Sequence, residues 1–105
     1  MTKTYIMVVQ SKAMPGQDDE YNRWYDEQHI HDVLNVPGMV SGARYTSIKG
    51  PMPGPAAPYL AIYEIETDDI DSVMGEFLRR SAAGEIPVST TLDQGNTALW
   101  LYEKR

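Results

Sequence analysis

Four stretches of the chain carry the apolar patterns that are typical of β-strands. Residues 4–11 (TYIMVVQS) are β-branched and aromatic, which predicts a strand covered on both faces. Residues 39–49 alternate loosely, and Gly42 inside them indicates a bulge or a close contact. Residues 59–66 predict a third strand, in which Tyr59, Ala61, Tyr63 and Ile65 face one side and Glu64 and Glu66 end the other. The segment 96–105 (NTALWLYEKR) predicts a fourth strand.

A first helix is predicted between the first two strands. Residues 18–30 place polar and aromatic side chains at spacings of three and four, namely Tyr21, Trp24, Tyr25 and Gln28. The helix is expected to end by the segment NVPG, because Pro37 disfavours a helical conformation at the residue before it. Gly38 then permits a turn into the second strand.

A second helix is predicted after the third strand, with Thr67 or Asp68 as its cap. It carries an apolar stripe made of Ile70, Val73, Met74, Phe77 and Leu78. Gly84 is expected to end it. The proline-rich segment 50–58 predicts a stiff loop, and residues 85–95 a long connection.

This order of elements, β-α-β-β-α-β, predicts an α+β fold of the ferredoxin-like type in a single domain, 1–105. Such a fold has a four-stranded antiparallel sheet with both helices on one face. The fourth strand is apolar on both faces, and the helices can cover only one of them. We therefore expect a homodimer that packs sheet to sheet into an α/β barrel, with further assembly left open.

The composition excludes several classes of partner. The formal charge of −6, with only nine Lys and Arg, argues against nucleic acid and anionic membrane as partners. The chain has no cysteine, so it has no disulfide and no thiolate nucleophile. No apolar run reaches the length of a membrane span, and no signal peptide is evident. We expect a soluble, cytoplasmic protein.

Both histidines lie in one short stretch, WYDEQHIHD (residues 24–32). On a helix, His29 follows Tyr25 by four residues and Asp26 by three, and Asp32 comes three residues later. A carboxylate or phenol beside one ring nitrogen would fix the tautomer and leave the other nitrogen free for acid/base work. The alternative is that His29 is a structural residue that bonds to the loop after the helix.

The second histidine is a weaker candidate. His31 lies about 200° around the helix from His29, nearer Trp24, and is expected at the surface or against a loop. We keep both His31 and Trp24 as candidate substrate contacts. A metal site is not expected, because two histidines at this spacing splay apart on a helix and the chain has no third one.

Tyrosines supply the remaining candidate polar groups. Tyr25 and Tyr63 are the preferred phenols of a pocket, while the other rings are expected in the core and the dimer interface. Arg44 either meets an anionic group of a substrate or pairs with an acid. Flexible, polarisable methionine side chains in a pocket wall would suit an apolar ligand. Packing in the core is nevertheless the more common role of such residues, which here are Met7, Met14, Met39, Met52 and Met74. No glycine-rich phosphate loop is present.

The stretch EYNRWYDEQHIHDVLNVPGMVSGARY (residues 20–45) resembles the dimeric α/β-barrel superfamily, in particular the EthD-like small proteins. Tyr25, His29, Pro37 and Gly38 match the pattern of that superfamily, whereas His31 stands where relatives often carry proline. The resemblance implies that His29 faces a cleft between the helices and the sheet. Relatives that bind haem place a histidine on the second helix, which has none here, so no cofactor is expected, although His29 alone could serve as an axial ligand.

These observations lead to one main hypothesis and two alternatives. The main one is a small cofactor-free isomerase, lyase or cyclase that acts on an apolar cyclic or aromatic metabolite. His29 would be the acid/base, oriented by Tyr25 or Asp26, and Tyr63 or Arg44 would stabilise oxyanion charge. The alternatives are a non-catalytic ligand-binding or accessory protein of a catabolic or biosynthetic pathway, and a cofactor-free monooxygenase.

Overall fold

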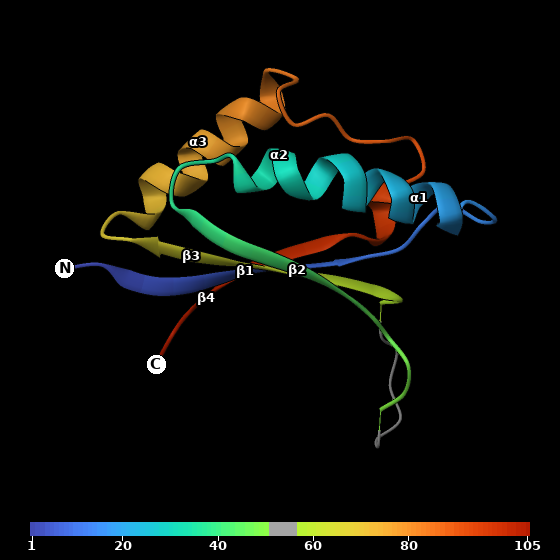
Figure 1. Ribbon diagram of the computed structural model, residues 1–105, viewed down its shortest axis with the longest axis horizontal. Helices are drawn as coiled ribbons and strands as arrows, with labels where there is room; N and C mark the ends of the chain where they lie inside the picture. The colour runs from blue at the N-terminus through green and yellow to red at the C-terminus, as the bar shows by residue number, and fades with distance from the viewer. Residues whose placement is uncertain (51–56) are drawn as a thin grey trace.

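The computed structural model describes residues 1–50 and 57–105, and it has the predicted ferredoxin-like arrangement (Figure 1). Its strands form one antiparallel sheet in the order β2-β3-β1-β4. Their bounds are β1 Lys3–Ser11, β2 Met39–Thr46, β3 Tyr59–Thr67 and β4 Ala98–Glu103. Most of the predicted proline-rich loop, with Met52, lies outside the described residues.

The first helical segment is longer than the sequence pattern predicted. It runs without a break through α1 (Asp18–Trp24), a π-helical turn η1 (Tyr25–His29) and α2 (Ile30–Leu34). It ends before Pro37, as expected. Gly38 then adopts a φ of 102°, which confirms the predicted glycine-dependent turn into β2.

The cap of the second helix differs from the prediction. Helix α3 (Ile70–Ala82) begins after Asp69, whose carboxylate accepts a hydrogen bond from the Ser72 N–H at 3.2 Å. The hydroxyl of Thr67 instead accepts from the Asp69 N–H at 3.0 Å. Asp69 is the cap because its side chain lies three residues before a free N–H of the first turn.

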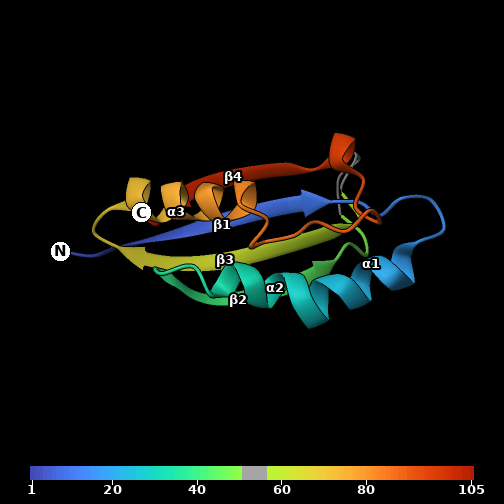
Figure 2. The same ribbon diagram turned by 90° about the horizontal axis from the view of Figure 1, so that it is seen from above.

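Both helical segments lie on one face of the sheet, and the connection after α3 passes between them (Figure 2). The core forms in this layer, where Tyr21, Tyr25, Tyr63 and Ile65 are buried. On β3 every second residue from Tyr59 to Ile65 is buried, which confirms the predicted alternation. Within the described residues, no helix is long and apolar enough to cross a membrane.

Among residues 1–50 and 57–105, no helix covers the opposite face of the sheet (Figure 1). The register of the strands places a set of apolar side chains on this open face: Ile6, Val8, Tyr45, Leu60, Ile62, Trp100 and Tyr102. Trp100 is 64% exposed and Tyr102 is 55% exposed. The expectation that β1 is covered on both faces is therefore not met within one chain, because the helices reach only one face.

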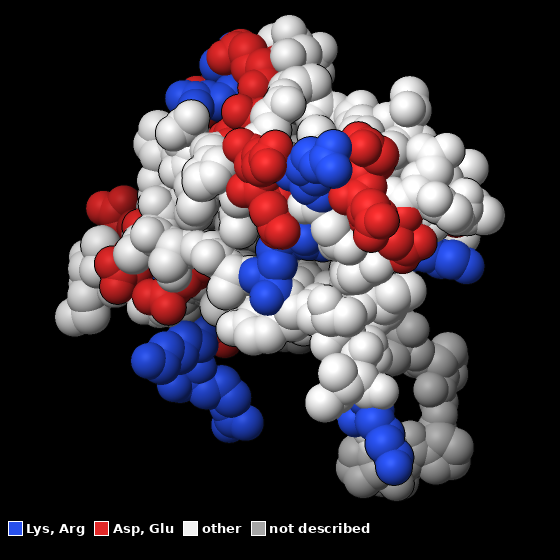
Figure 3. Space-filling view, turned by 45° about the vertical axis from the view of Figure 1, so that its right-hand side comes forward, with Lys and Arg blue, Asp and Glu red and all other residues white. Residues whose placement is uncertain are grey.

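Charged side chains of both signs are mixed on the surface that Figure 3 shows. Lys and Arg lie next to Asp and Glu over the helices, and no broad basic patch appears on this face.

Candidate functional site

A cavity of about 150 Å³ lies between the helices and the sheet. Its walls come from β1, β3, β4, η1, α2, α3 and the connection after α3. The apolar part of the wall consists of Met7, Val9, Val33, Phe77, Ile86, Val88, Leu92 and Leu99. Val88 and Leu99 are 47% and 41% exposed, whereas Tyr63 is fully buried. The cavity therefore opens to solvent near Val88 and Leu99 and is closed at Tyr63.

A larger depression of about 610 Å³ lies beside the start of α3. Its lining includes Glu66, Asp68 and Asp69 and contains neither a histidine nor an aromatic ring. It is wide and open, and its lining includes four carboxylates. The smaller, mostly apolar cavity is therefore the candidate functional site.

The π-helical turn positions His29 in the cavity wall. The N–H of Ile30 bonds to the carbonyl of Tyr25, five residues earlier, which widens the turn. As a result Trp24 and His29 stack, with ring centroids 4.5 Å apart and planes at 29°. The Tyr25 ring meets the same imidazole edge-on at 4.8 Å. The imidazole is thus held by two rings, in a helical irregularity that often marks a functional site.

The surroundings of His29 keep it neutral. Burial lowers the pKa of His29 below its ordinary value of 6.5, and the Arg44 charge lowers it further. The Asp32 carboxylate and the nearby backbone of Pro87 oppose this change in the pKa. Since proline has no N–H, its carbonyl must be the group that faces the imidazole. The ring is therefore uncharged at pH 7 and able to accept a proton.

Two buried phenols meet at the closed end of the cavity. The Tyr63 hydroxyl donates a hydrogen bond of 3.1 Å to the Tyr25 hydroxyl. Burial raises the pKa of Tyr25 to about 12 and raises the pKa of Tyr63 as well, so both stay protonated. Tyr25 acts as the acceptor in this pair, which leaves its own hydrogen available to a ligand.

Arg44 lies on the other side of these rings and does not line the cavity. Its guanidinium carbon is 4.3 Å from the centroid of the Tyr25 ring, a cation–π contact. It donates to the Asp26 carboxylate at 2.9 Å and to the Asn22 side chain at 3.0 Å. The plainer of the two predicted roles of Arg44, an ion pair with an acid, is the one that the structure shows.

The remaining predicted residues are placed apart from the cavity. Asp26 is bound to Arg44 and is 61% exposed, so the structure gives it a partner other than His29. His31 is exposed. Trp24 contacts His29 but is not part of the cavity wall. Of the predicted residues, the structure brings His29, Tyr25 and Tyr63 together in the wall.

Sequence reasoning missed the contribution of the connection after α3. Ile86, Val88 and Leu92 line the cavity, and the Pro87 carbonyl faces His29. The available signal was the set of apolar residues in an otherwise polar loop. Backbone bonds fix this connection to the end of β1, because the Met14 N–H donates to the Thr91 carbonyl at 2.7 Å.

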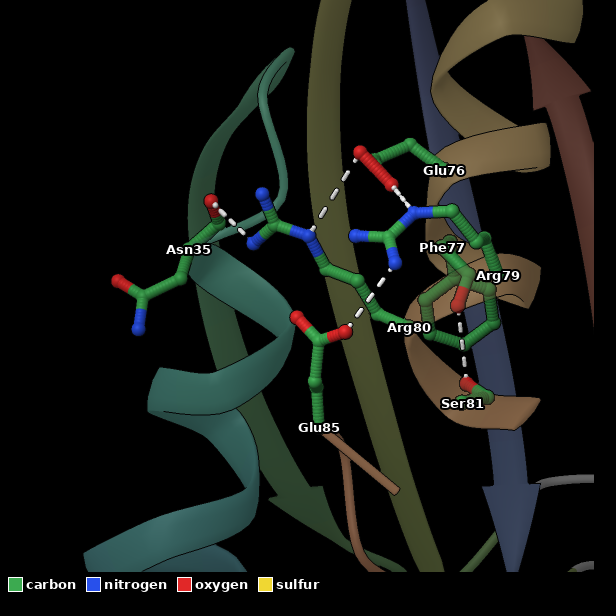
Figure 4. Close-up of polar contacts among 7 residues, drawn as sticks. All are labelled: Asn35, Glu76, Phe77, Arg79, Arg80, Ser81 and Glu85. Atoms are coloured by element: carbon green, nitrogen blue, oxygen red, sulfur yellow. Dashed lines mark hydrogen bonds and ion pairs between the residues drawn. The ribbon is translucent and has the colours of Figure 1, made fainter. Parts of the chain in front are cut away.

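Ion pairs on α3 hold the other end of the same connection (Figure 4). Arg79 donates to Glu85 at 3.1 Å and also pairs with Glu76 one turn earlier. Arg80 donates to the carbonyl of Asn35 at 3.1 Å, which joins α3 to the end of α2. These contacts fasten the cavity wall on the side opposite the sheet.

The described residues hold no group of three or more His, Cys, Asp or Glu side chains that could bind a metal ion. The site is built from an imidazole, two phenols, the hydroxyl side chains of Ser11, Ser81 and Thr97, and apolar walls. This set of groups can bind a small apolar molecule, donate a hydrogen bond to an oxygen and accept a proton.

Known structures share the fold of this chain at low sequence identity. An EthD family protein from Bacillus halodurans has a TM-score of 0.66 and 17% identity, covering 98% of this chain and 99% of its own. A putative antibiotic biosynthesis monooxygenase from Bordetella bronchiseptica has a TM-score of 0.72 and 17% identity, covering 98% of both chains. The chain shares the ferredoxin-like fold of these EthD family and monooxygenase-like structures. The sequence itself matches no protein-family model and no curated protein.

A third similar structure holds a cofactor. The haem-degrading protein MhuD from Mycobacterium tuberculosis, with two haems in its active site, has a TM-score of 0.66 and 15% identity over 95% of this chain and 94% of its own. Haem does not fit the present cavity, since 150 Å³ is below the roughly 300–1,000 Å³ of clefts that hold drug-sized ligands. Helix α3 also carries no histidine.

Proposed function

We propose that this protein is a small enzyme that moves a proton on a monocyclic carbonyl compound bound in the cavity. The observation that carries the proposal is the meeting of a neutral, buried imidazole and an available phenol hydrogen in one apolar cavity. His29 is the proton acceptor, and Tyr25 donates a hydrogen bond to the carbonyl oxygen. Isomerases, lyases and cyclases all use such a step.

The size of the cavity supports a ligand with a single ring. A dry apolar cavity of about 150 Å³ in another protein binds benzene, and the cavity here has about the same volume. The polar groups lie at its closed end and the apolar side chains at its mouth. A ligand would therefore enter with its oxygen first and leave its apolar edge at Val88 and Leu99.

The roles of the tyrosines differ from those expected from the sequence. Tyr63 donates to Tyr25, so the phenol that can reach a ligand oxygen is Tyr25. A hydrogen bond received by the Tyr25 oxygen makes its own hydrogen a stronger donor, because bonds in a chain polarise one another. The two phenols together form the group that would stabilise an enolate in the transition state.

Binding in the cavity is tested with a panel of monocyclic ketones and lactones, observed by ligand NMR. Leu99→Trp fills the mouth and is expected to weaken binding at least about tenfold, or 1.4 kcal/mol. Leu101→Trp is the matched control, since Leu101 lies on the same face of β4 but does not line the cavity. Equal binding by both variants would place the ligand elsewhere.

A cofactor-free oxygenase is the second candidate. It is supported by structural neighbours described as putative monooxygenases, from Bordetella bronchiseptica and Shewanella loihica. The same base would form the carbanion that reacts with oxygen. Oxygen consumption that requires both the ligand and His29 would favour this candidate over an isomerase. Binding without either reaction would favour the non-catalytic alternative.

We also propose that two copies pack through their open sheet faces. Large exposed apolar patches mark interaction surfaces, and a second copy presents the same self-complementary face. Trp100→Glu is expected to convert a dimer into a monomer in light scattering. Leu78→Glu, a matched change on the exposed side of α3, is expected to leave the dimer intact. A monomeric native protein would contradict the proposal.

A further inference from the structure

Two buried polar atoms on one turn of the first helical segment have no hydrogen-bond partner among the described residues. They are Nδ1 of His29 and Oδ2 of Asp32. Residues three apart on a helix lie on the same face. Buried polar atoms without a partner are rare in folded proteins, and two on one face therefore call for a common explanation.

The other buried atoms without a partner have a simpler explanation. They are the Nε atoms of Arg44 and Arg80, whose guanidinium groups bond through another nitrogen. Nδ1 of His29 has no comparable explanation, because no other atom of this ring makes a hydrogen bond among the described residues. Asp26 was the predicted partner of His29, but its carboxylate forms an ion pair with Arg44 instead.

The groups that face His29 come from several elements. Asp32 is on its own helical segment, Arg44 is on β2, and the Pro87 carbonyl is in the connection after α3. The rings of Trp24 and Tyr25 complete its surroundings. Among these groups Asp32 is the only carboxylate. It is also the one whose buried oxygen still lacks a donor.

We propose that Asp32 is the positioning residue of the site, which binds the Nδ1–H of His29 and leaves Nε2 to exchange protons with the ligand. This inference rests on the proposed function of His29. Asp32 and His29 form no direct hydrogen bond in the ligand-free chain. Bonds of this kind are often long in ligand-free sites and tighten when a ligand binds, by a side-chain rotation or through a bridging water.

The arrangement accounts for the whole path of the proton. Nε2 takes a proton from the carbon beside the ligand carbonyl, and the C–H electron pair passes into the enolate. The resulting imidazolium has two N–H groups. The carboxylate of Asp32 receives the Nδ1–H, and the Nε2–H stays beside the ligand carbon from which the proton came. The proton then returns to the ligand, and no oxidant or reductant is required.

The test measures the tautomer and pKa of His29 by nitrogen NMR of the imidazole in the ligand-free protein. The native protein is expected to carry its hydrogen on Nδ1. Asp32→Asn is expected to shift the hydrogen toward Nε2 and to lower the pKa of His29 further. Glu27→Gln removes the same charge from an exposed neighbouring position and is expected to change neither. His31, which is exposed, is the internal reference.

Each outcome decides the inference. A hydrogen on Nε2 in the native protein would overturn it, even where Asp32→Asn fails to fold. The same tautomer and pKa in the native and Asp32→Asn proteins would overturn it too. These readouts need no ligand, so they are independent of turnover. Loss of the proposed enzyme activity with the expected tautomer would leave the pairing of Asp32 with His29 in place.

Discussion

Replacing His29 with phenylalanine is expected to lower the rate of proton exchange by about 10²–10⁴-fold, the usual contribution of a positioned acid or base. Phenylalanine keeps a ring between Trp24 and Tyr25, so packing is largely preserved while the base is lost. The measurement follows exchange of the α-hydrogens of cyclohexanone with D₂O by proton NMR. His31→Ala is the control and is expected to retain the native rate.

The pH dependence gives an independent check on the same residue. In the proposed mechanism the neutral form of His29 is the base, and burial lowers its pKa below 6.5. Activity is therefore expected to persist as the pH falls to 6.5 and to be lost only when the pH passes through the lowered pKa. A rate that already declines above pH 6.5 would show that another group is the base. An unchanged rate in the His29 variant would contradict the proposed mechanism.

Replacing Gly38 with alanine is expected to reduce the free energy of unfolding by about 2–6 kcal/mol. Gly38 has a φ of 102°, which costs a residue with a side chain about 1–3 kcal/mol. An added Cβ would also lie 2.7 Å from Cγ2 of the buried Val73 on α3. Overpacking of this kind costs about 1–3 kcal/mol, because a β-branched side chain cannot rotate away freely.

Gly16→Ala separates the two contributions. Gly16 also has a positive φ, of 77°, but nothing lies within 4 Å of its added Cβ. It is therefore expected to show the backbone cost alone, and both variants are measured by urea unfolding. If Gly38→Ala is no more destabilising than Gly16→Ala, the contact with Val73 does not constrain the turn between α2 and β2.

Several local features followed directly from the sequence. The alternation on residues 59–66 predicted the buried face of β3, and Pro37 with Gly38 predicted the end of the first helix. The concentration of histidines and aromatic residues at 24–32 pointed to His29 and Tyr25. Each of these depends on neighbours within one or two turns, which is the range over which sequence periodicity and backbone preference act.

Other features depended on strand pairing and could not be read from spacing. Asp26 and Asp32 are both three residues from His29, so spacing alone does not choose between them. The structure distinguishes the two, because Arg44 on β2 pairs with Asp26, while Oδ2 of Asp32 has no hydrogen-bond partner among the described residues. The register that sets Tyr63 opposite Met7 likewise places its hydroxyl against Tyr25.

The sequence by itself therefore determined the order of elements, their approximate extent and the helical segment that carries His29. The tertiary structure decided which side chains surround His29, because a cavity is closed by residues far apart in the chain. His29, Tyr63, Ile86 and Leu99 meet only after the sheet has formed and both helices have packed on it. Long-range packing, which leaves no period in the sequence, fixes the volume and polarity of the site.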